Sequence, residues 1–532
     1  MAPLDYPFFY DGVGYFGTLG AIFDPPSLWE GLRLIWSTEG PPFFAKESSV
    51  FFCSGPLYLS LQLLCLKLIG FSYPKALAVQ AFICGMLCLL ILKFMRQGSP
   101  WIKTKVDSFL LILLGIFFLF AGGIWHPLPG SLFDFRVDLA GSLLLTLALV
   151  ACPRRDWTSA LTFALAGLER FHNLSILIPT LSLWAIVDAF SGNFSRPRIL
   201  RQIALNLRYP LGGIIGLILL RFPQVEALFF HYFHGYFGSE IGLRGFSWKN
   251  EGFFSFYPRA LLNDFILWQP WVFASCGLGF LLFLFRKDLE FDWRKPPPLL
   301  LGSGVAFFLL TWNATRNNIG VLRFAWIPFL FYAVQLSSII LVMLSSKMKK
   351  YRSIPIYVLL GLCLWSVQLE AQKLQAFHEH FDYLGFRKNH YKRQLDQTWE
   401  ILYQDWQSQP RTTDAFITMG ANFNSDFNLN HLQWHIFLAE KGLPAIPFKF
   451  TTGWSFHEEE FEKEELGKIK DLNYLLNGSP GCGNPEVPLN AQYKEHFRQA
   501  SDLAEFHCPQ ILSQITLESC RMELRKCLSP QR

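Results

Sequence analysis

The sequence has neither a P-loop nor a dinucleotide-binding glycine fingerprint, which argues against a pump driven by nucleotide hydrolysis. It also lacks an internal repeat and a low-complexity tract, and its basic residues do not form the single patch that nucleic-acid binding needs. Hydrophobic residues are abundant instead: they make up 51% of the chain, which has 54 Phe and a mean hydropathy of +0.26. This composition suits helices that face lipid.

The first 72 residues contain no signal peptide and no apolar stretch long enough to cross a bilayer. Phe8–Phe23 comes nearest, but it is too short and contains Asp11 and four glycines. Pro56–Leu68 is amphipathic and is expected to lie along the membrane interface. We therefore expect residues 1–72 to form an extracytoplasmic first segment with interfacial helices, and this placement leaves open whether a further span lies upstream.

Residues 73–370 alternate apolar runs of about 15–24 residues with short loops. Lys and Arg gather in every second loop, and the positive-inside rule places these loops in the cytoplasm. The basic loops contain Lys103 and Lys105, Arg154 and Arg155, Arg196 and Arg208, Arg286 and Lys295, and Lys347 and Arg352. The spans between them include Tyr73–Phe94, Val137–Cys152, Leu211–Phe222 and Leu299–Trp312. The pattern predicts an α-helical polytopic membrane domain with about 10–11 transmembrane helices.

The run from Ser159 to Asp188 is long enough for two spans, but the polar patch Glu169–Asn173 interrupts it. Irregular backbone at membrane depth is tolerated where it is buried in protein or lines a cavity. We therefore expect Arg170 and His172 to face protein or a cavity.

The C-terminal region, residues 371–532, has an ordinary soluble composition and should lie outside the membrane. Thr413–Met419 is typical of a buried strand, His431–Lys441 of an amphipathic helix, and Glu458–Lys470 of a charged helix. We predict a small α/β domain. Its four cysteines favour two disulfides in an oxidising compartment, with free thiols or a metal site as alternatives: Cys482, Cys508, Cys520 and Cys527. Cysteines in the apolar region, such as Cys84 and Cys152, are expected to be inert.

Asp11 is the first candidate for chemistry, because it lies among aromatic residues and glycines at the outer surface. A carboxylate there could act as a general base on a hydroxyl. The alternative is a structural role, since Asp-Gly is a common turn dipeptide and aspartate often begins helices.

Asp134, Arg136 and Asp138 lie at the outer mouth of a span, where ionisable residues must be paired or functional. Asp134 could assist binding, whereas Asp138 could equally form a structural ion pair. The outer loop 223–261 carries His231, His234 and Tyr236 among other aromatic residues. Such residues suit a sugar-binding or headgroup-binding surface, and equally an aromatic belt at the membrane interface. The two histidines have no firm third ligand, so no metal site is predicted.

Arg316 and Arg323 flank the outer end of another span, and Lys46 lies in the first outer segment. Guanidinium groups are natural partners of a phosphate or pyrophosphate. Snorkelling of these long side chains to lipid headgroups is the alternative.

Taken in order, these motifs resemble the GT-C superfamily of polyprenyl-phosphate-sugar-dependent glycosyltransferases, in particular protein O-mannosyltransferases and the lipid A aminoarabinose transferase. Asp11 and Tyr15 match an aspartate and tyrosine of the family's first outer loop, although Gly12 replaces the usual second acidic residue. The other matching stretches, over about residues 8–345, are Gly55–Tyr58, Leu68–Pro74, Arg136–Ala140, Phe229–Tyr236, Trp268–Trp271 and Arg323–Pro328.

The resemblance implies an inverting glycosyltransferase of a bacterial inner or plasma membrane, acting on the extracytoplasmic side. Its donor would be a sugar on a polyprenyl phosphate, and its acceptor a hydroxyl of a glycan, lipid or protein. Asp11 is the predicted catalytic base, and no cofactor is predicted, although the replacement of the second acidic residue by Gly12 leaves a divalent metal open. The donor phosphate would bind Lys46, Arg136, Arg316 and Arg323, and the substrates Tyr15, Asp134, His231, His234 and Tyr236. A lipid-linked sugar flippase and a non-enzymatic membrane assembly protein are the alternatives.

Overall fold

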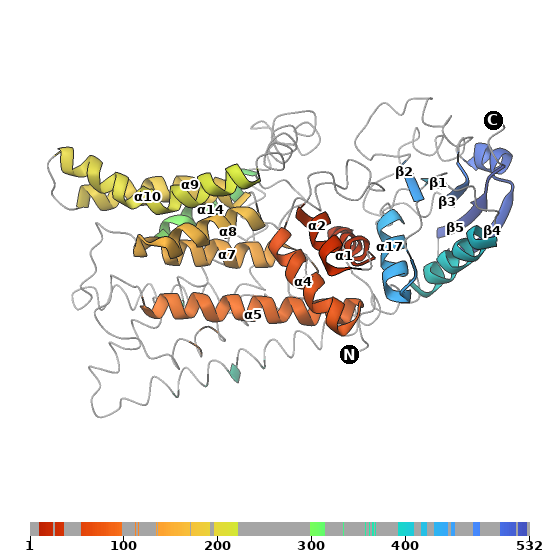
Figure 1. Ribbon diagram of the computed structural model, residues 1–532, viewed down its shortest axis with the longest axis horizontal. Helices are drawn as coiled ribbons and strands as arrows, with labels where there is room; N and C mark the ends of the chain where they lie inside the picture. The colour runs from red at the N-terminus through yellow and green to blue at the C-terminus, as the bar shows by residue number, and fades with distance from the viewer. Residues whose placement is uncertain are drawn as a thin grey trace. The chain divides into compact units, whose positions relative to one another are not determined.

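The computed structural model separates into two compact units (Figure 1). Unit 1 comprises Met1–Cys53, Leu59–Ala76 and His380–Arg532, and unit 2 comprises Ser54–Tyr58 and Leu77–Glu379. Unit 1 therefore joins the N-terminal segment to the C-terminal region. The residues that the structure describes are 10–24, 27–36, 55–97, 135, 137–170, 172–191, 196–221, 298–313, 392–408, 417–422, 430–444, 448–452, 472–478, 501–517, 520–528 and a few single positions.

Three helices in the described part of the chain are long and apolar enough to cross a membrane: Tyr73–Met95, Val137–Arg154 and Pro197–Leu220. They belong to α5 (Tyr73–Gln97), to α7 (Val137–Ala151) with the short η2 (Cys152–Arg154), and to α10 (Arg196–Leu220). The first two begin at the residues predicted from the apolar runs. α7 is buried on all sides, whereas α5 and α10 expose apolar side chains such as Phe82 and Leu219, as suits contact with lipid.

The start of α10 corrects a prediction, because residues 196–210 were expected to precede the helix rather than to belong to it. Its arginines fit a helix because Arg198, Arg201 and Arg208 all lie on the exposed side. Gln202 and Asn206 instead donate hydrogen bonds to the Asp188 carboxylate, at 3.2 and 2.8 Å.

The predicted break between two apolar runs is confirmed: α8 (Trp157–Glu169) ends at the first residue of the polar patch, and α9 (His172–Ser191) begins within the patch. Asp156 caps α8, because its carboxylate accepts the backbone N–H groups of Thr158 and Ser159. α8 packs against α7 and α10, and α14 (Pro298–Asn313) packs against α9. These helices form the body of unit 2.

Unit 1 begins with three helices: α1 (Tyr10–Phe23), α2 (Leu28–Trp36) and α4 (Pro56–Ile69). Phe16 of α1 stacks on Phe71, which follows α4, with ring centroids 4.7 Å apart. α2 is tied to α4 by a hydrogen bond from the Trp36 indole to the Ser60 hydroxyl. The expected interfacial position of α4 stays a prediction, and its exposed Leu61, Leu64 and Leu68 suit it.

The C-terminal part of unit 1 contains a five-stranded sheet in the order β2-β1-β3-β5-β4. Three strands run parallel to one another: β1 (Ile417–Asn422), β2 (Phe448–Thr452) and β3 (Tyr474–Gly478). The sheet is completed by β5 (Cys520–Lys526), which pairs antiparallel with β3, and by β4 (Gln510–Leu517), which pairs antiparallel with β5. The helix expected over His431–Lys441 is confirmed as α17 (Asn430–Lys441), which connects β1 to β2. β1 ends three residues later than the predicted strand. The charged helix expected over Glu458–Lys470 lies outside the described residues.

The domain core lies between this sheet and two helices, α17 and residues 392–408. Trp399 and Trp434 pack edge to face at its centre, with ring centroids 5.6 Å apart. The carboxylate of Asp405 fixes the second helix to the sheet by accepting hydrogen bonds from the Tyr474 hydroxyl, at 2.6 Å, and the Lys526 ammonium, at 2.9 Å.

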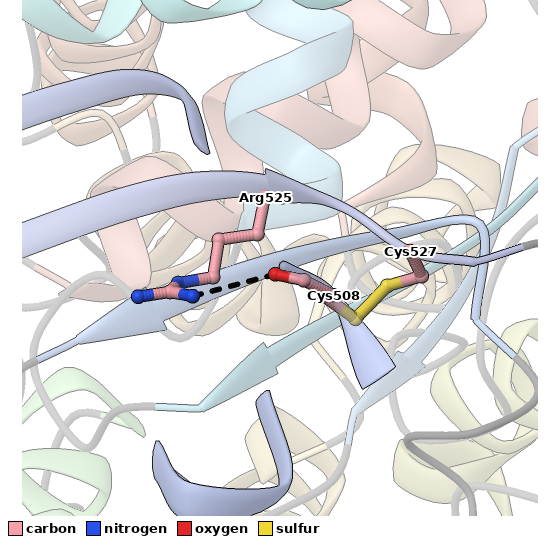
Figure 2. The surroundings of a disulfide bond; sticks show 3 residues. All are labelled: Cys508, Arg525 and Cys527. Atoms are coloured by element: carbon pink, nitrogen blue, oxygen red, sulfur yellow. Dashed lines mark hydrogen bonds between the residues drawn. A yellow bond between two sulfur atoms is a disulfide. The ribbon is translucent and has the colours of Figure 1, made fainter. Parts of the chain in front are cut away.

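A disulfide joins Cys508 to Cys527, which confirms a disulfide within the predicted set of four cysteines. The Arg525 guanidinium donates a hydrogen bond to the carbonyl oxygen of Cys508, at 3.3 Å, and thereby supports the same corner of the domain (Figure 2). Cys482 and the side chain of Cys520 lie outside the described residues. A disulfide of this kind is typical of an oxidising compartment.

Reduction of the Cys508–Cys527 bond should lower the free energy of unfolding of the C-terminal domain by about 3 kcal/mol. The reason is that the bond closes a loop of 19 residues and restricts the unfolded chain. Urea unfolding of the detergent-solubilised protein, with and without a thiol reductant, measures the effect. Cys508→Ser should match the reduced protein, and Cys65→Ser, which removes a free thiol, is the control. An unchanged midpoint for Cys508→Ser would contradict the prediction.

Candidate functional site

The first turn of α4 is capped by a side chain from a remote helix. Pro56 is the first residue of α4, and the free backbone N–H groups of Leu57 and Tyr58 need acceptors. The carboxylate of Glu169, at the end of α8, accepts both, with 3.2 Å from the Tyr58 nitrogen to Oε2. The carbonyl oxygen of Glu169 also accepts the N–H of Gly55, at 2.8 Å. By supplying these acceptors, Glu169 stabilises the entry into α4.

Gly55 is required at this entry for two reasons. Its φ of +68° is a backbone conformation that residues with a Cβ adopt only at a cost. A Cβ at this position would also collide with the side chain of Val137, in the first turn of α7. The close approach of the Gly55 backbone to α7 and α8 therefore depends on a residue without a side chain.

The first turn of α7 is tied to the same break between α8 and α9. Asp138 forms an ion pair with Arg170, 2.8 Å between Oδ1 and Nη2, and both side chains are largely buried. The amide of Asn173 donates to the carbonyl oxygens of Gly141 and Ala166, both at 2.8 Å. A structural ion pair was one of the two interpretations of Asp138, and this is the geometry observed.

Three stretches that the sequence singled out therefore meet in one place: Gly55–Tyr58, the start of α7 and the polar patch Glu169–Asn173. Tyr58 extends the contact, since its ring lies 5.5 Å from that of Phe135 and its hydroxyl donates to the amide oxygen of Gln80. We name this group the Glu169 cluster, and it comprises Gly55, Leu57, Tyr58, Gln80, Asp138, Glu169, Arg170 and Asn173.

The contacts of the Glu169 cluster position the backbone. Glu169 is fully buried and its Oε2 accepts the N–H of Tyr58, while Oε1 has no hydrogen-bond partner in the described part of the chain. The Asp138–Arg170 pair neutralises its own two charges at close range. The arrangement fixes residues 55–58 to the start of α7 and the end of α8.

Two residues of the predicted reaction site lie in described elements. Asp11 is the second residue of α1, and Tyr15 lies half-buried one turn later in the same helix. Their spacing places them on one side of the helix, as an i, i+4 pair. The side chain of Asp11 is outside the described residues, as are all the other predicted site residues: Lys46, Asp134, Arg136, His231, His234, Tyr236, Arg316 and Arg323.

A second buried polar contact was not predicted from the sequence. Asp24, directly after α1, lies 3.1 Å from Nδ1 of His435 in α17, and both side chains are almost inaccessible to water. Burial raises the pKa of Asp24 against the opposing effect of the hydrogen bond to His435. A histidine in the middle of an apolar helix run was the available signal, but no local pattern names its partner.

The described residues contain no group of three or more His, Cys, Asp or Glu side chains that could hold a metal ion. Comparison of the chain with protein-family models, with curated proteins and with solved structures finds no match. The function is therefore argued from the chain's own residues.

Proposed function

We propose that this protein is an integral membrane glycosyltransferase of the GT-C type, with about 10–11 transmembrane helices. It transfers a sugar from a polyprenyl phosphate to an acceptor hydroxyl on the extracytoplasmic side of a cell membrane. The observation that carries the proposal is the meeting of Gly55–Tyr58 and the start of α7 in the Glu169 cluster. Both stretches belong to the motif series on which the resemblance rests, and they lie more than 70 residues apart in the sequence.

The Cys508–Cys527 disulfide supports the proposed orientation. Structural disulfides persist in oxidising compartments and are rare in the cytosol. The charge pattern of the loops independently assigns the C-terminal region to the extracytoplasmic side. Two unrelated properties of the chain therefore favour the same side of the membrane for this domain.

In the proposed reaction, Asp11 accepts the proton of the acceptor hydroxyl as that oxygen bonds to the anomeric carbon of the donor sugar. The bond from this carbon to the phosphate oxygen breaks, and polyprenyl phosphate leaves with the electron pair. Lys46, Arg136, Arg316 and Arg323 stabilise the negative charge of the leaving phosphate. Because the displacement is direct, the anomeric configuration is inverted.

The proposal is tested with the purified protein, a panel of polyprenyl-phosphate sugars of known anomeric configuration and an acceptor extract from cell envelopes. We expect transfer from at least one lipid-linked donor and none from the corresponding nucleotide sugars. NMR analysis of the product should show the opposite anomeric configuration to that of the donor. Retention of configuration would exclude the direct displacement.

The same experiment separates the alternatives. A flippase would move a lipid-linked sugar across reconstituted vesicles without releasing polyprenyl phosphate. An assembly protein would do neither, and its function would tolerate replacement of Asp11 and Arg323. Release of polyprenyl phosphate that depends on an acceptor is therefore the deciding measurement.

A further inference from the structure

Helix α1, which carries Asp11 and Tyr15, packs within unit 1 against α17 of the C-terminal domain. The two helices approach so closely that a Cβ at Gly20 would lie 3.0 Å from the carbonyl oxygen of His435. Glycine at this position therefore lets the α1 backbone reach the α17 backbone. The contact joins segments that are about 400 residues apart in the sequence, so it is built by the tertiary fold alone.

The buried pair of Asp24 and His435 closes this interface at the C-terminal end of α1. The carboxylate Oδ2 lies 3.1 Å from Nδ1 of the imidazole, and the exposed fractions of the two side chains are 3% and 5%. The backbone N–H of Asp24 donates to the carbonyl oxygen of Gly20, which fixes Asp24 as the end of the helix. A hydrogen bond with so little access to water fixes the rotation and the axial position of one helix on the other.

The ammonium of Lys67 completes the end of α1 from the side of α4. It donates to the carbonyl oxygen of Phe23, at 2.7 Å, and lies 4.4 Å from the centre of the Phe23 ring. Its positive charge also attracts the Asp24 carboxylate, which opposes the rise in the pKa of Asp24. Three elements therefore hold the last turn of α1: α17 through His435, α4 through Lys67, and the α4–α5 connection through Phe71, whose ring lies 5.0 Å from that of Phe23.

We propose that the Asp24–His435 pair makes the C-terminal domain a positioning element for the reaction, because it fixes the helix that carries Asp11 to α17. The inference rests on the proposed function and assigns a role to the extracytoplasmic domain within it. Asp24 and His435 act through α1 and are positioning residues, not catalytic ones. Breaking the pair lets α1 shift, and a misplacement of about 1 Å at a reacting group can cost about 100-fold in rate.

The experiment compares the full-length protein with Asp24→Leu, His435→Leu and the double variant. Transfer kinetics are measured together with hydrogen–deuterium exchange of the α1 amides. We expect kcat to fall at least about tenfold with little change in the KM of the donor. Exchange in the last turn of α1 should accelerate in both single variants. The double variant should be no worse than either single one, because the three variants remove the same interaction.

Two further variants exclude a general loss of stability. Asp24→Asn keeps an acceptor for the imidazole and should recover most of kcat and of the α1 protection. Lys392→Met breaks the ion pair between Lys392 and Glu440. This ion pair fixes α17 to residues 392–408 and does not involve α1. This control should leave kcat and α1 exchange unchanged, although it destabilises the same domain.

The outcomes are distinct. Unchanged α1 exchange in Asp24→Leu and His435→Leu would overturn the inference, as would accelerated exchange with wild-type kcat. Equal losses of kcat in Lys392→Met would reduce the pair to a stability effect and also overturn it. Accelerated α1 exchange in a protein whose wild type transfers no sugar would instead overturn the proposed function, and the structural link between α1 and α17 would stand.

Discussion

Replacement of Asp11 by Asn should lower kcat for sugar transfer by about 10²- to 10⁴-fold, the usual contribution of a general base. Asparagine has nearly the same size and shape, but its amide cannot accept the proton of an acceptor hydroxyl. Asp11 lies in the first turn of α1, where loss of its charge should cost at most about 1 kcal/mol of stability. The KM of the lipid-linked donor should change little, because in the proposed reaction the cations, and not Asp11, hold the phosphate.

The measurement is initial-rate transfer at saturating acceptor, with thermal unfolding recorded for each variant. Asp5→Asn is the matched control, because it also removes a carboxylate from the N-terminal segment, but at a position before α1 begins. The wild-type rate should fall in acid as the base becomes protonated, and the residual rate of Asp11→Asn should not. Full transfer by Asp11→Asn would refute the assignment of the base.

Apolar runs and polar interruptions in the sequence predicted the local structure well. The starts of α5 and α7 coincide with the first residues of two predicted apolar runs, and the α8–α9 break follows from five polar or aromatic residues in succession. The start of α10 differs from the prediction, because a run of arginines is as compatible with an exposed helix surface as with a basic loop. In the folded chain they lie on an exposed helix side, while Asn206 on the other side reaches Asp188.

The contacts that organise the two units could not be predicted from local pattern. Glu169 was recognised only as part of a polar patch, since the helix that it caps lies 111 residues earlier. The partner of Asp24 is 411 residues away in the sequence. Four cysteines can form two disulfides in three ways, and the sequence does not indicate which way contains Cys508–Cys527. Long-range pairs of this kind depend on the packing of whole helices and strands. The reaction site itself stays a prediction, because nearly all of its side chains lie outside the described residues.

The Glu169 cluster yields the second large effect. Glu169→Ala should lower the free energy of unfolding of the protein by about 2–4 kcal/mol, because it leaves the buried N–H groups of Leu57 and Tyr58 without acceptors. Glu169→Gln keeps a carbonyl oxygen for these donors and should cost only about 1 kcal/mol. The contrast isolates the capping hydrogen bonds from the volume of the side chain.

Thermal unfolding and hydrogen–deuterium exchange of the α4 amides measure the effect on the detergent-solubilised protein. Exchange in the first turn of α4 should accelerate in Glu169→Ala, because the helix would lose its fixed N-terminus, and much less in Glu169→Gln. Glu505→Ala is the control, because it removes a carboxylate from the exposed face of residues 501–507, outside the cluster. Equal destabilisation by Ala and Gln would show that the hydrogen bonds from Glu169 to α4 do not cause the effect, and would contradict the prediction.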